Sequence, residues 1–202
     1  MFQRFAIDAL PATPWKNGGG NTREIVCQPL GADMDGFDWR VSIATIAQAG
    51  PFSAFAGVDR VIMLLDGAGV HLHGAGVEHR LDVPLRPFAF SGDVALGCDV
   101  LGAVSTDFNV MTRRGVLHAD VQVLHAACDV VPAEQGLLLA WGGAWSVQSI
   151  PQRSEMPKVP WDSDKLLCAA GCGGWWQGRA QGWRVQPRSA DSALVVVRLV
   201  GV

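Results

Sequence analysis

Residues 61–81 decide the fold, and they read Val61-Ile62-Met63-Leu64-Leu65, Asp66-Gly67-Ala68-Gly69, Val70-His71-Leu72-His73, Gly74-Ala75-Gly76 and Val77-Glu78-His79-Arg80-Leu81. Three short apolar or alternating segments are separated here by two glycine-containing turns. Glycine readily adopts the positive φ angles that tight hairpin turns require. The stretch therefore predicts consecutive antiparallel strands joined by hairpins.

The rest of the chain has the same character. Glycine occurs 24 times and proline 11 times, and short β-branched runs such as 40–46 and 192–199 recur, whereas helical periodicity is weak throughout. We therefore expect an all-β protein. Residues 22–28, which follow a glycine run, are expected to form a strand, and residues 163–170 at most a short turn.

A faint internal repeat indicates how the strands are grouped. Residues 64–70, a proline-containing stretch and residues 92–96 are echoed by residues 138–145, a second proline-containing stretch and residues 162–167, with an offset of 74 residues from Leu64 to Leu138. Such a repeat suits two jelly-roll β-barrels that share one continuous core. We expect residues 1–202 to form a single domain with approximate halves 1–112 and 113–202.

Composition excludes several classes of protein. Hydrophobic residues make up 49% and charged residues 17%, against about 25% charged residues in ordinary domains, which excludes a disordered chain or a coiled coil. The net charge is −3 without a run of like charges, so neither nucleic acid nor a membrane is expected as a partner. The five scattered cysteines predict no disulfide framework, and the absence of an apolar window of about 18 residues leads us to expect a cytoplasmic protein.

The most unusual segment is Pro14-Trp15-Lys16-Asn17-Gly18-Gly19-Gly20-Asn21-Thr22-Arg23-Glu24. Three glycines among hydrogen-bonding side chains suit the close approach of an anionic or polar ligand. A nucleotide-binding phosphate loop is excluded, because the lysine precedes the glycines and a strand rather than a helix is expected after them. A tight turn with solvated charges is the alternative interpretation.

Two further runs place polar groups on one face of a strand. Alternation puts Arg40 and Ser42 on the same face, where the planar guanidinium could grip a carboxylate from a cavity wall. Asp107, Asn109 and Met111 share a face in the same way. The alternatives are an arginine that faces water at a sheet edge, and polar side chains that brace a loop.

The histidines invite a metal-binding interpretation. His71, His73 and Glu78 have the His-x-His-x4-Glu spacing of the first metal motif of cupins, but the flanking glycines are out of place and no second motif supplies a fourth ligand. His71 and His73 also alternate with Val70 and Leu72, so they face outward if the apolar pair packs inside. We expect no metal and no other cofactor, and no serine or cysteine has the setting of a catalytic nucleophile.

Several segments together resemble the HutD/Ves family of bicupins. They are Thr13–Ile25, Arg40–Ala44, Gly50–Phe55 with Gly57–Arg60, Phe90–Asp93 and Asp107–Met111. The resemblance covers residues 3–125 by motif and the remainder only by architecture. It implies a two-barrel cupin fold without the metal-binding histidines.

The family resemblance also implies a function. Members are linked to bacterial histidine utilisation as accessory or regulatory proteins, with urocanate or a formylated product as the expected ligand, and no enzymatic activity is implied. The corresponding pocket residues here, with the glycine run added, are Trp15, Lys16, Asn17, Gly18, Gly19, Gly20, Thr22, Arg23, Glu24, Arg40, Ser42, Phe52, Ser53, Arg60, Asp107, Asn109 and Met111.

Two other classes of function stay open from the sequence. One is an enzyme, either a metal-free isomerase or lyase with Glu24 or Asp107 as general base, or a metal-dependent cupin at the two histidines. The other is a partner-binding scaffold. We expect the segment with Trp175, Trp176 and Trp183 to form either an oligomer contact, such as a homodimer interface, or a loop that closes the second barrel.

Overall fold

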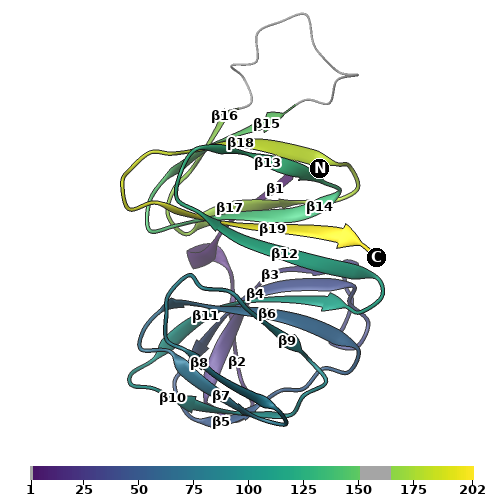
Figure 1. The fold of residues 1–202 in the computed structure, drawn as a ribbon, viewed down its shortest axis with the longest axis vertical. Helices are drawn as coiled ribbons and strands as arrows, with labels where there is room; N and C mark the ends of the chain where they lie inside the picture. The colour runs from purple at the N-terminus through teal and green to yellow at the C-terminus, as the bar shows by residue number, and fades with distance from the viewer. Residues whose placement is uncertain (1, 151–164) are drawn as a thin grey trace, which may run out of the picture. The chain divides into compact units, whose positions relative to one another are not determined.

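The computed structural model describes residues 2–150 and 165–202 and confirms the all-β fold (Figure 1). The one helical element in these ranges is a 3₁₀ turn, η1 (Ile7–Ala9), and none of their helices is long and apolar enough to cross a membrane. The chain divides into two compact units. We call residues 10–119 with 201–202 the N-terminal barrel, and the residues up to 9 with 120–200 the C-terminal barrel.

The N-terminal barrel consists of two antiparallel sheets. The six-stranded sheet has the order β2 (Ala12–Pro14), β3 (Gly20–Gln28), β4 (Trp39–Ile46), β11 (Ser105–Arg113), β6 (Val58–Asp66) and β9 (Phe88–Ser91). The four-stranded sheet has the order β5 (Gly50–Phe52), β10 (Leu96–Val100), β7 (Val70–Gly74) and β8 (Val77–Leu81). Residues 22–28 lie in β3, as expected.

The stretch that decides the fold contains one hairpin, not two. Strands β7 and β8 pair as predicted, but β6 pairs with β11 and β9 and does not pair with β7. The expected β6–β7 hairpin was therefore wrong. Gly67 and Gly69 both have positive φ, and a Cβ on either would collide with backbone of another segment. This tight glycine turn carries the chain from one sheet to the other instead of folding it back.

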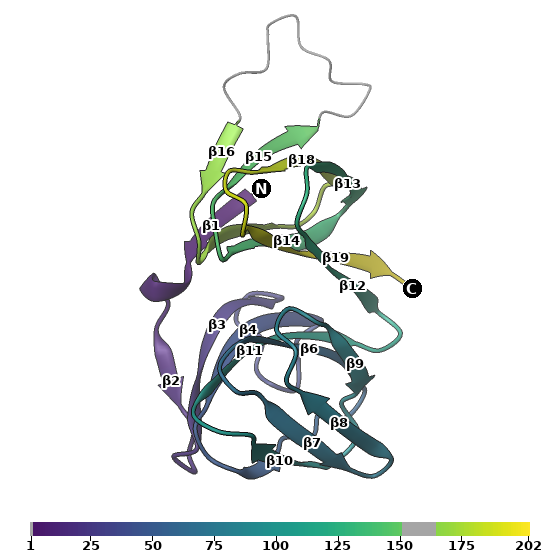
Figure 2. The same ribbon diagram turned by 60° about the vertical axis from the view of Figure 1, so that its left-hand side comes forward.

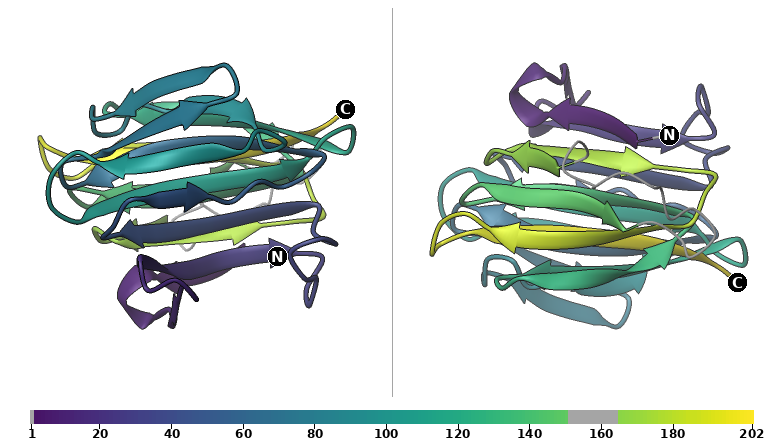
Figure 3. Two further views of the ribbon diagram at one scale, coloured as in Figure 1. Left: turned by 90° about the horizontal axis from the view of Figure 1, so that it is seen from below. Right: turned by 90° about the horizontal axis from the view of Figure 1, so that it is seen from above.

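The C-terminal barrel is also built from two antiparallel sheets, whose strands run side by side in Figure 3. The five-stranded sheet has the order β1 (Phe2–Ala6), β17 (Cys172–Trp176), β14 (Gln135–Trp141), β19 (Ala193–Gly201) and β12 (Leu117–Leu124). The four-stranded sheet has the order β13 (Cys128–Ala133), β18 (Gln181–Pro187), β15 (Trp145–Ile150) and β16 (Lys165–Cys168).

Strand β16 corrects the expectation of a turn at residues 163–170. It pairs with β15, and every second side chain, Leu166 and Cys168, packs toward the core. This strand has only four residues, too short to show periodicity in the sequence. Residues 162–164, which belong to the expected repeat, lie outside the described residues.

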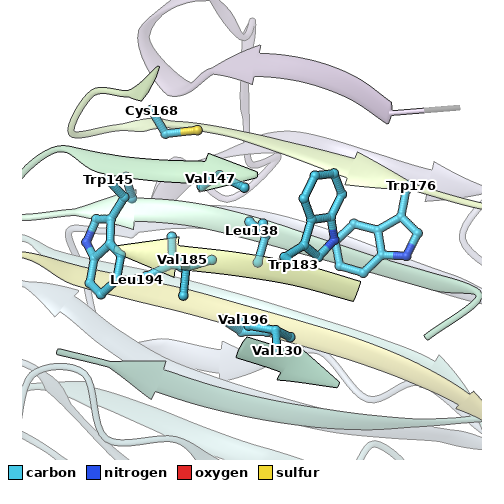
Figure 4. Packing of buried hydrophobic residues seen from close by; sticks show 11 residues of the cluster. Val130, Leu138, Trp145, Val147, Cys168, Trp176, Trp183, Val185, Leu194 and Val196 are labelled. Atoms are coloured by element: carbon cyan, nitrogen blue, oxygen red, sulfur yellow. The ribbon is translucent and has the colours of Figure 1, made fainter. Parts of the chain in front are cut away.

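Two of the three tryptophans in the C-terminal segment are core residues. Trp176 and Trp183 are 2% and 3% exposed, and their rings pack edge to face 5.4 Å apart (Figure 4). Trp176 lies on β17 and donates its indole N–H to the carbonyl of Ala133 at 2.8 Å. The expected oligomer contact or closing loop was wrong for these two residues, because both are packed inside a sheet sandwich.

Candidate functional site

The six-stranded sheet arranges side chains of the N-terminal barrel in rows. Residues directly opposite each other in an antiparallel pair lie on the same face of the sheet. The first row, which we call the arginine row, contains Cys27, Arg40, Met111, Arg60 and Phe90. The second contains Glu24, Ser42, Asn109, Ile62 and Phe88. The third contains Thr22, Ala44, Asp107 and Leu64.

These rows face the interior of the barrel. Ile62 and Leu64 belong to the second and third rows and are fully buried in the same apolar cluster as Leu72 and Leu96 of the opposite sheet. The alternation predicted for β4 and β11 is thereby confirmed, since Arg40 and Ser42 share the inner face with Asp107, Asn109 and Met111. The barrel interior is apolar at one end and rich in hydrogen-bonding groups at the other.

Arg60 is a buried cation with 6% of its surface exposed. One terminal nitrogen donates to the carbonyl of Ser53 at 3.0 Å, and the other donates to Oδ1 of Asn109 at 2.8 Å. Its Nε–H has no acceptor. Among the residues that the structure describes, no carboxylate forms an ion pair with Arg60.

Three aromatic rings surround this guanidinium. Its central carbon lies 4.5, 5.4 and 5.2 Å from the ring centroids of Phe52, Phe55 and Phe90. Burial, together with repulsion from Arg40, lowers the pKa of Arg60 to about 9. The side chain therefore stays charged at neutral pH, held by aromatic faces and neutral oxygens without a counter-ion.

The charge of Arg40 is neutralised by the exposed carboxylate of Glu24. Its Nε donates to Glu24 Oε2 at 2.7 Å, and the two side chains are 11% and 48% exposed. A terminal nitrogen also lies 3.3 Å from the hydroxyl of Ser42 and 3.9 Å from the sulfur of Met111. The exposed carboxylate of Glu24 thus occupies the position in which a ligand carboxylate could replace it.

A surface network holds the loop that carries Phe52, Ser53 and Phe55. Asp93 accepts a hydrogen bond from the backbone N–H of Gly57 at 2.6 Å and pairs with Arg114. These contacts and Ser91 hold the pKa of Asp93 at about 2. The Gly-Asp motif at 92–93 therefore positions the aromatic loop.

Asp107 is fully buried, and neither of its carboxyl oxygens has a hydrogen-bond partner. Desolvation raises its pKa to about 7. Its charge in turn contributes to the raised pKa of the buried Cys98, on the opposite sheet. Since Asp107 lies four residues from Met111, it is roughly 14 Å along the strand from the arginine row.

The glycine run forms the turn between β2 and β3. The N–H of Gly18 donates to the carbonyl of Trp15, and the N–H of Gly19 donates to Oδ1 of Asn17, both at 3.0 Å. These two donors are used within the loop, and the side chains of Lys16 and Asn17 are exposed. The geometry favours the turn interpretation for this loop.

The rest of the first motif divides between two faces of β3. Trp15 packs against the barrel core and donates its indole N–H to Thr22 Oγ1 at 2.8 Å. Arg23 lies on the opposite face from Thr22 and Glu24 and donates to the carbonyl of Leu10 at 2.5 Å. Thr22 and Glu24 therefore join the inward rows, and Arg23 does not.

His71 and His73 point away from the core, as alternation predicted. Val70 and Leu72, which alternate with them, are fully buried. His71 Nε2 lies 2.7 Å from Glu78, and His73 Nε2 lies 3.2 Å from Asp99. Within residues 2–150 and 165–202, no group of three or more histidine, cysteine, aspartate or glutamate side chains is placed to hold a metal ion.

The matched family decides the identity of the chain. A family model described as HutD matches residues 8–181. The chain belongs to the HutD family. It is 36% identical over 174 residues to the protein Ves of Cronobacter sakazakii, a match that covers 86% of each chain.

Solved structures agree with this assignment. HutD from Pseudomonas fluorescens SBW25, in a structure from a formate condition, matches with a TM-score of 0.77 at 29% identity over the full length of both chains. Oxalate decarboxylase from Lactobacillus farciminis matches with a TM-score of 0.64 at 9% identity, covering 99% of this chain and 88% of that one. The latter likeness shows the fold alone, that of a bicupin.

The inward-facing groups of this HutD-family barrel do not fit the divalent metal of metal-dependent cupins. Such ions need neutral imidazoles and carboxylates that converge on one point. Here the corresponding interior holds two guanidinium groups, Arg40 and Arg60, which would repel a cation. The arrangement is chemically suited to an anion.

Phe55 and Phe90 are site residues that the sequence prediction missed. Both lie in segments that carry the family resemblance, and Phe90 is opposite Arg60 on neighbouring strands. The sequence signal that could have identified them is an aromatic residue two positions before a glycine, as in Phe55 before Gly57 and Phe90 before Gly92. A separate cavity of about 10 Å³ is lined in part by Trp15, Asn17, Phe52 and Cys98 but by neither arginine of the row, and it has room for about one water molecule.

Proposed function

We propose that the N-terminal barrel binds a small carboxylate metabolite without a metal ion, and that the protein is an accessory or regulatory component of histidine utilisation. Urocanate or a formylated product of the pathway is the ligand that this proposal names. The family membership supports the pathway, and the electrostatics of the arginine row support the ligand class.

One observation carries the proposal: Arg60 is buried with a positive charge and no carboxylate partner among the described residues. Burying a charge without a counter-ion costs several kcal/mol unless something compensates for it. Asn109, Ser53 and the aromatic rings compensate only in part, because the Nε–H remains without an acceptor. A ligand carboxylate supplies both the missing charge and the missing acceptor.

The surroundings of Arg60 also restrict the ligand. Phe52 and Phe90 offer flat apolar faces, and Asn109 offers an amide. An anion with a planar or short apolar body fits these groups better than phosphate does. Because Arg60 is buried among these side chains, a ligand reaches it only when the exposed Glu24 leaves Arg40 or an aromatic side chain moves.

Calorimetric titration tests the proposal directly. We expect urocanate or formylated glutamate to bind the wild-type protein, histidine to bind more weakly because of its ammonium group, and formate to bind weakly as the smallest carboxylate. Arg60→Gln should abolish binding at the arginine row, whereas Arg80→Gln, an exposed arginine paired with Asp82, should not change it. Absence of binding by all four compounds at millimolar concentration would refute the ligand class.

A second candidate function is supported by Asp107. A buried carboxyl group with a pKa of about 7 is poised to accept a proton at neutral pH. This supports a metal-free isomerase or lyase only for a substrate that reaches the third row, because Asp107 is buried and lies roughly 14 Å along the strand from the arginine row. Incubation of the protein with each ligand in deuterated water, followed by NMR, would detect the proton exchange that such a base must cause.

A further inference from the structure

We propose that the C-terminal barrel carries a second ligand site, for a small organic acid with an apolar body, in the cavity between β1 and β16. The cavity has a volume of about 380 Å³, within the range of about 300–1,000 Å³ typical of small-molecule sites. It is lined by residues of the C-terminal barrel alone. The inference is independent of the function proposed for the N-terminal barrel.

The cavity lies at the side of this barrel, between the edge strands of its two sheets. β1 is the edge of the five-stranded sheet and β16 is the edge of the four-stranded sheet (Figure 2). In the β1–β17 pair, Phe2 is opposite the core residue Trp176, so Phe2 and Arg4 share the inner face of the sheet. Cys168 faces them from β16.

Phe2 forms the aromatic wall of the cavity, and Gly174 leaves the space for its ring. A Cβ at Gly174 would overlap the ring of Phe2, which therefore lies directly on the backbone of β17. Phe5 is opposite Gly173, and its ring lies on the other face of the sheet from Phe2 and Arg4. Phe2 and Leu166 together give an apolar surface for the body of a ligand.

Arg4 supplies the positive charge at this surface. Arg4 forms no hydrogen bond or ion pair within the part of the chain that the structure describes. Its positive charge lies close enough to Cys168 to lower the pKa of that thiol, which partly offsets the increase caused by burial. A cation without an acidic partner among the described residues favours an anionic ligand.

The thiol of Cys168 is neutral at physiological pH and adds no competing charge. Burial and the neighbouring Cys172 both raise the pKa of Cys168. An arginine above an apolar floor grips a carboxylate with two parallel hydrogen bonds while the floor contacts the hydrocarbon. A monocarboxylic acid with an aromatic or branched body satisfies both requirements.

Calorimetry with 3-phenylpropionate and its neutral amide tests the charge requirement. We expect the acid to bind and the amide to bind at least tenfold more weakly. Arg4→Gln should weaken binding of the acid by about tenfold or more, the usual effect of losing a charge-assisted hydrogen bond. The exposed Arg188→Gln in the same barrel should leave it unchanged, and binding at this cavity should persist in Arg60→Gln, which removes only the arginine of the N-terminal barrel.

Thiol labelling provides a test on the wild-type protein. Cys172 lines the cavity and is partly exposed, whereas Cys128 is exposed elsewhere on the same barrel. We expect 3-phenylpropionate to slow alkylation of Cys172 by iodoacetamide several-fold without affecting Cys128. Equal binding of acid and amide, loss of binding in Arg60→Gln instead of Arg4→Gln, or unchanged labelling of Cys172 would overturn the proposal.

Discussion

The two guanidinium groups of the arginine row differ in what neutralises them. Arg40 has the exposed carboxylate of Glu24, whereas Arg60 has neutral oxygens and aromatic faces. An exposed ion pair contributes only about 0.2–1 kcal/mol, so a ligand carboxylate can displace Glu24 at little cost. Under the proposed function, Glu24 is therefore expected to compete weakly with the ligand carboxylate for Arg40.

Removing that competitor should tighten binding. We expect Glu24→Gln to lower the Kd for a carboxylate ligand by about two- to fivefold, which corresponds to loss of an exposed ion pair. Arg40→Ala should raise the Kd, costing about 1.5–3 kcal/mol with little change in melting temperature. Titration of both variants decides this, and weaker binding in Glu24→Gln would show that Glu24 contacts the ligand as a favourable partner.

Asp107 should make the stability of the protein depend on pH. Its pKa is about 7 in the folded protein and 3.8 in an unfolded chain, so the folded state holds a proton that the unfolded state releases between these values. The resulting stability is complete below about pH 4 and is lost as pH rises to about 7. A shift of this size corresponds to roughly 4 kcal/mol.

The Asp107→Asn variant isolates this effect, because asparagine keeps the shape of the side chain and cannot ionise. We expect it to unfold at a higher urea concentration than wild type at pH 8, with the difference shrinking toward pH 4. Urea unfolding at several pH values measures the slope. Parallel curves for the two proteins across this range would show that Asp107 is ionised, and compensated, in the folded state.

At the scale of elements, the turn between β2 and β3 assigns different tasks to its glycines. Gly18 has a φ of +72° with open space around its Cβ position, whereas a Cβ on Gly20 would collide with the carbonyl of Thr45 on β4. The first glycine serves the turn, and the other serves close contact between strands. Gly19 has room for a methyl group, with Oδ1 of Asn17 at 3.4 Å.

Alanine at the three positions should therefore have graded effects. We expect Gly18→Ala to cost about 1 kcal/mol through its positive φ, Gly20→Ala to cost more through collision with β4, and Gly19→Ala to change stability little. None should alter ligand affinity if the loop is only a turn. Thermal unfolding and calorimetry on each variant check both points, and a Gly19→Ala protein that melts normally but no longer binds would place the loop in the site.

The elements of the site were predictable where alternation governs them. The inward faces of β4 and β11 follow from period-two patterning, and so does the outward direction of His71 and His73. Alternation also separates Arg23 from its neighbours, a distinction that transfer by family resemblance did not make. The convergence of Phe55, Phe90 and Arg60 could not be read from the sequence, because it depends on which strands pair.

Strand pairing was also the point at which the fold prediction failed. The glycines of residues 66–69 were correctly read as a turn, but the same residues suit a hairpin and a crossing between sheets. Only long-range contacts, such as that of Gly67 with backbone at Val104, select the crossing. Similarly, Trp176 and Trp183 alternate with glycines and polar residues, and their burial depends on a partner sheet distant in sequence.

At the scale of the whole molecule, the chain order and the spatial units do not coincide. Strand β1 begins the described chain, yet it pairs with β17 in the C-terminal barrel, with Phe2 opposite Trp176 and Ala6 opposite Cys172. The Phe2 ring of β1 packs against the core of that barrel. A change at the start of the chain should therefore be felt in the strands near its end.

Phe2→Ala tests this connection. Because the ring is only partly buried, we expect a loss of about 2 kcal/mol in stability, below the range for fully buried phenylalanines. The loss should concentrate in the C-terminal barrel, so amide hydrogen exchange should accelerate in β17 and β14 and remain unchanged in β4 and β11. Gln3→Ala, an exposed position on the same strand, is the matched control. Uniform acceleration across both barrels would instead mean that the two units unfold as one cooperative structure, in which case Phe2 stabilises the whole chain.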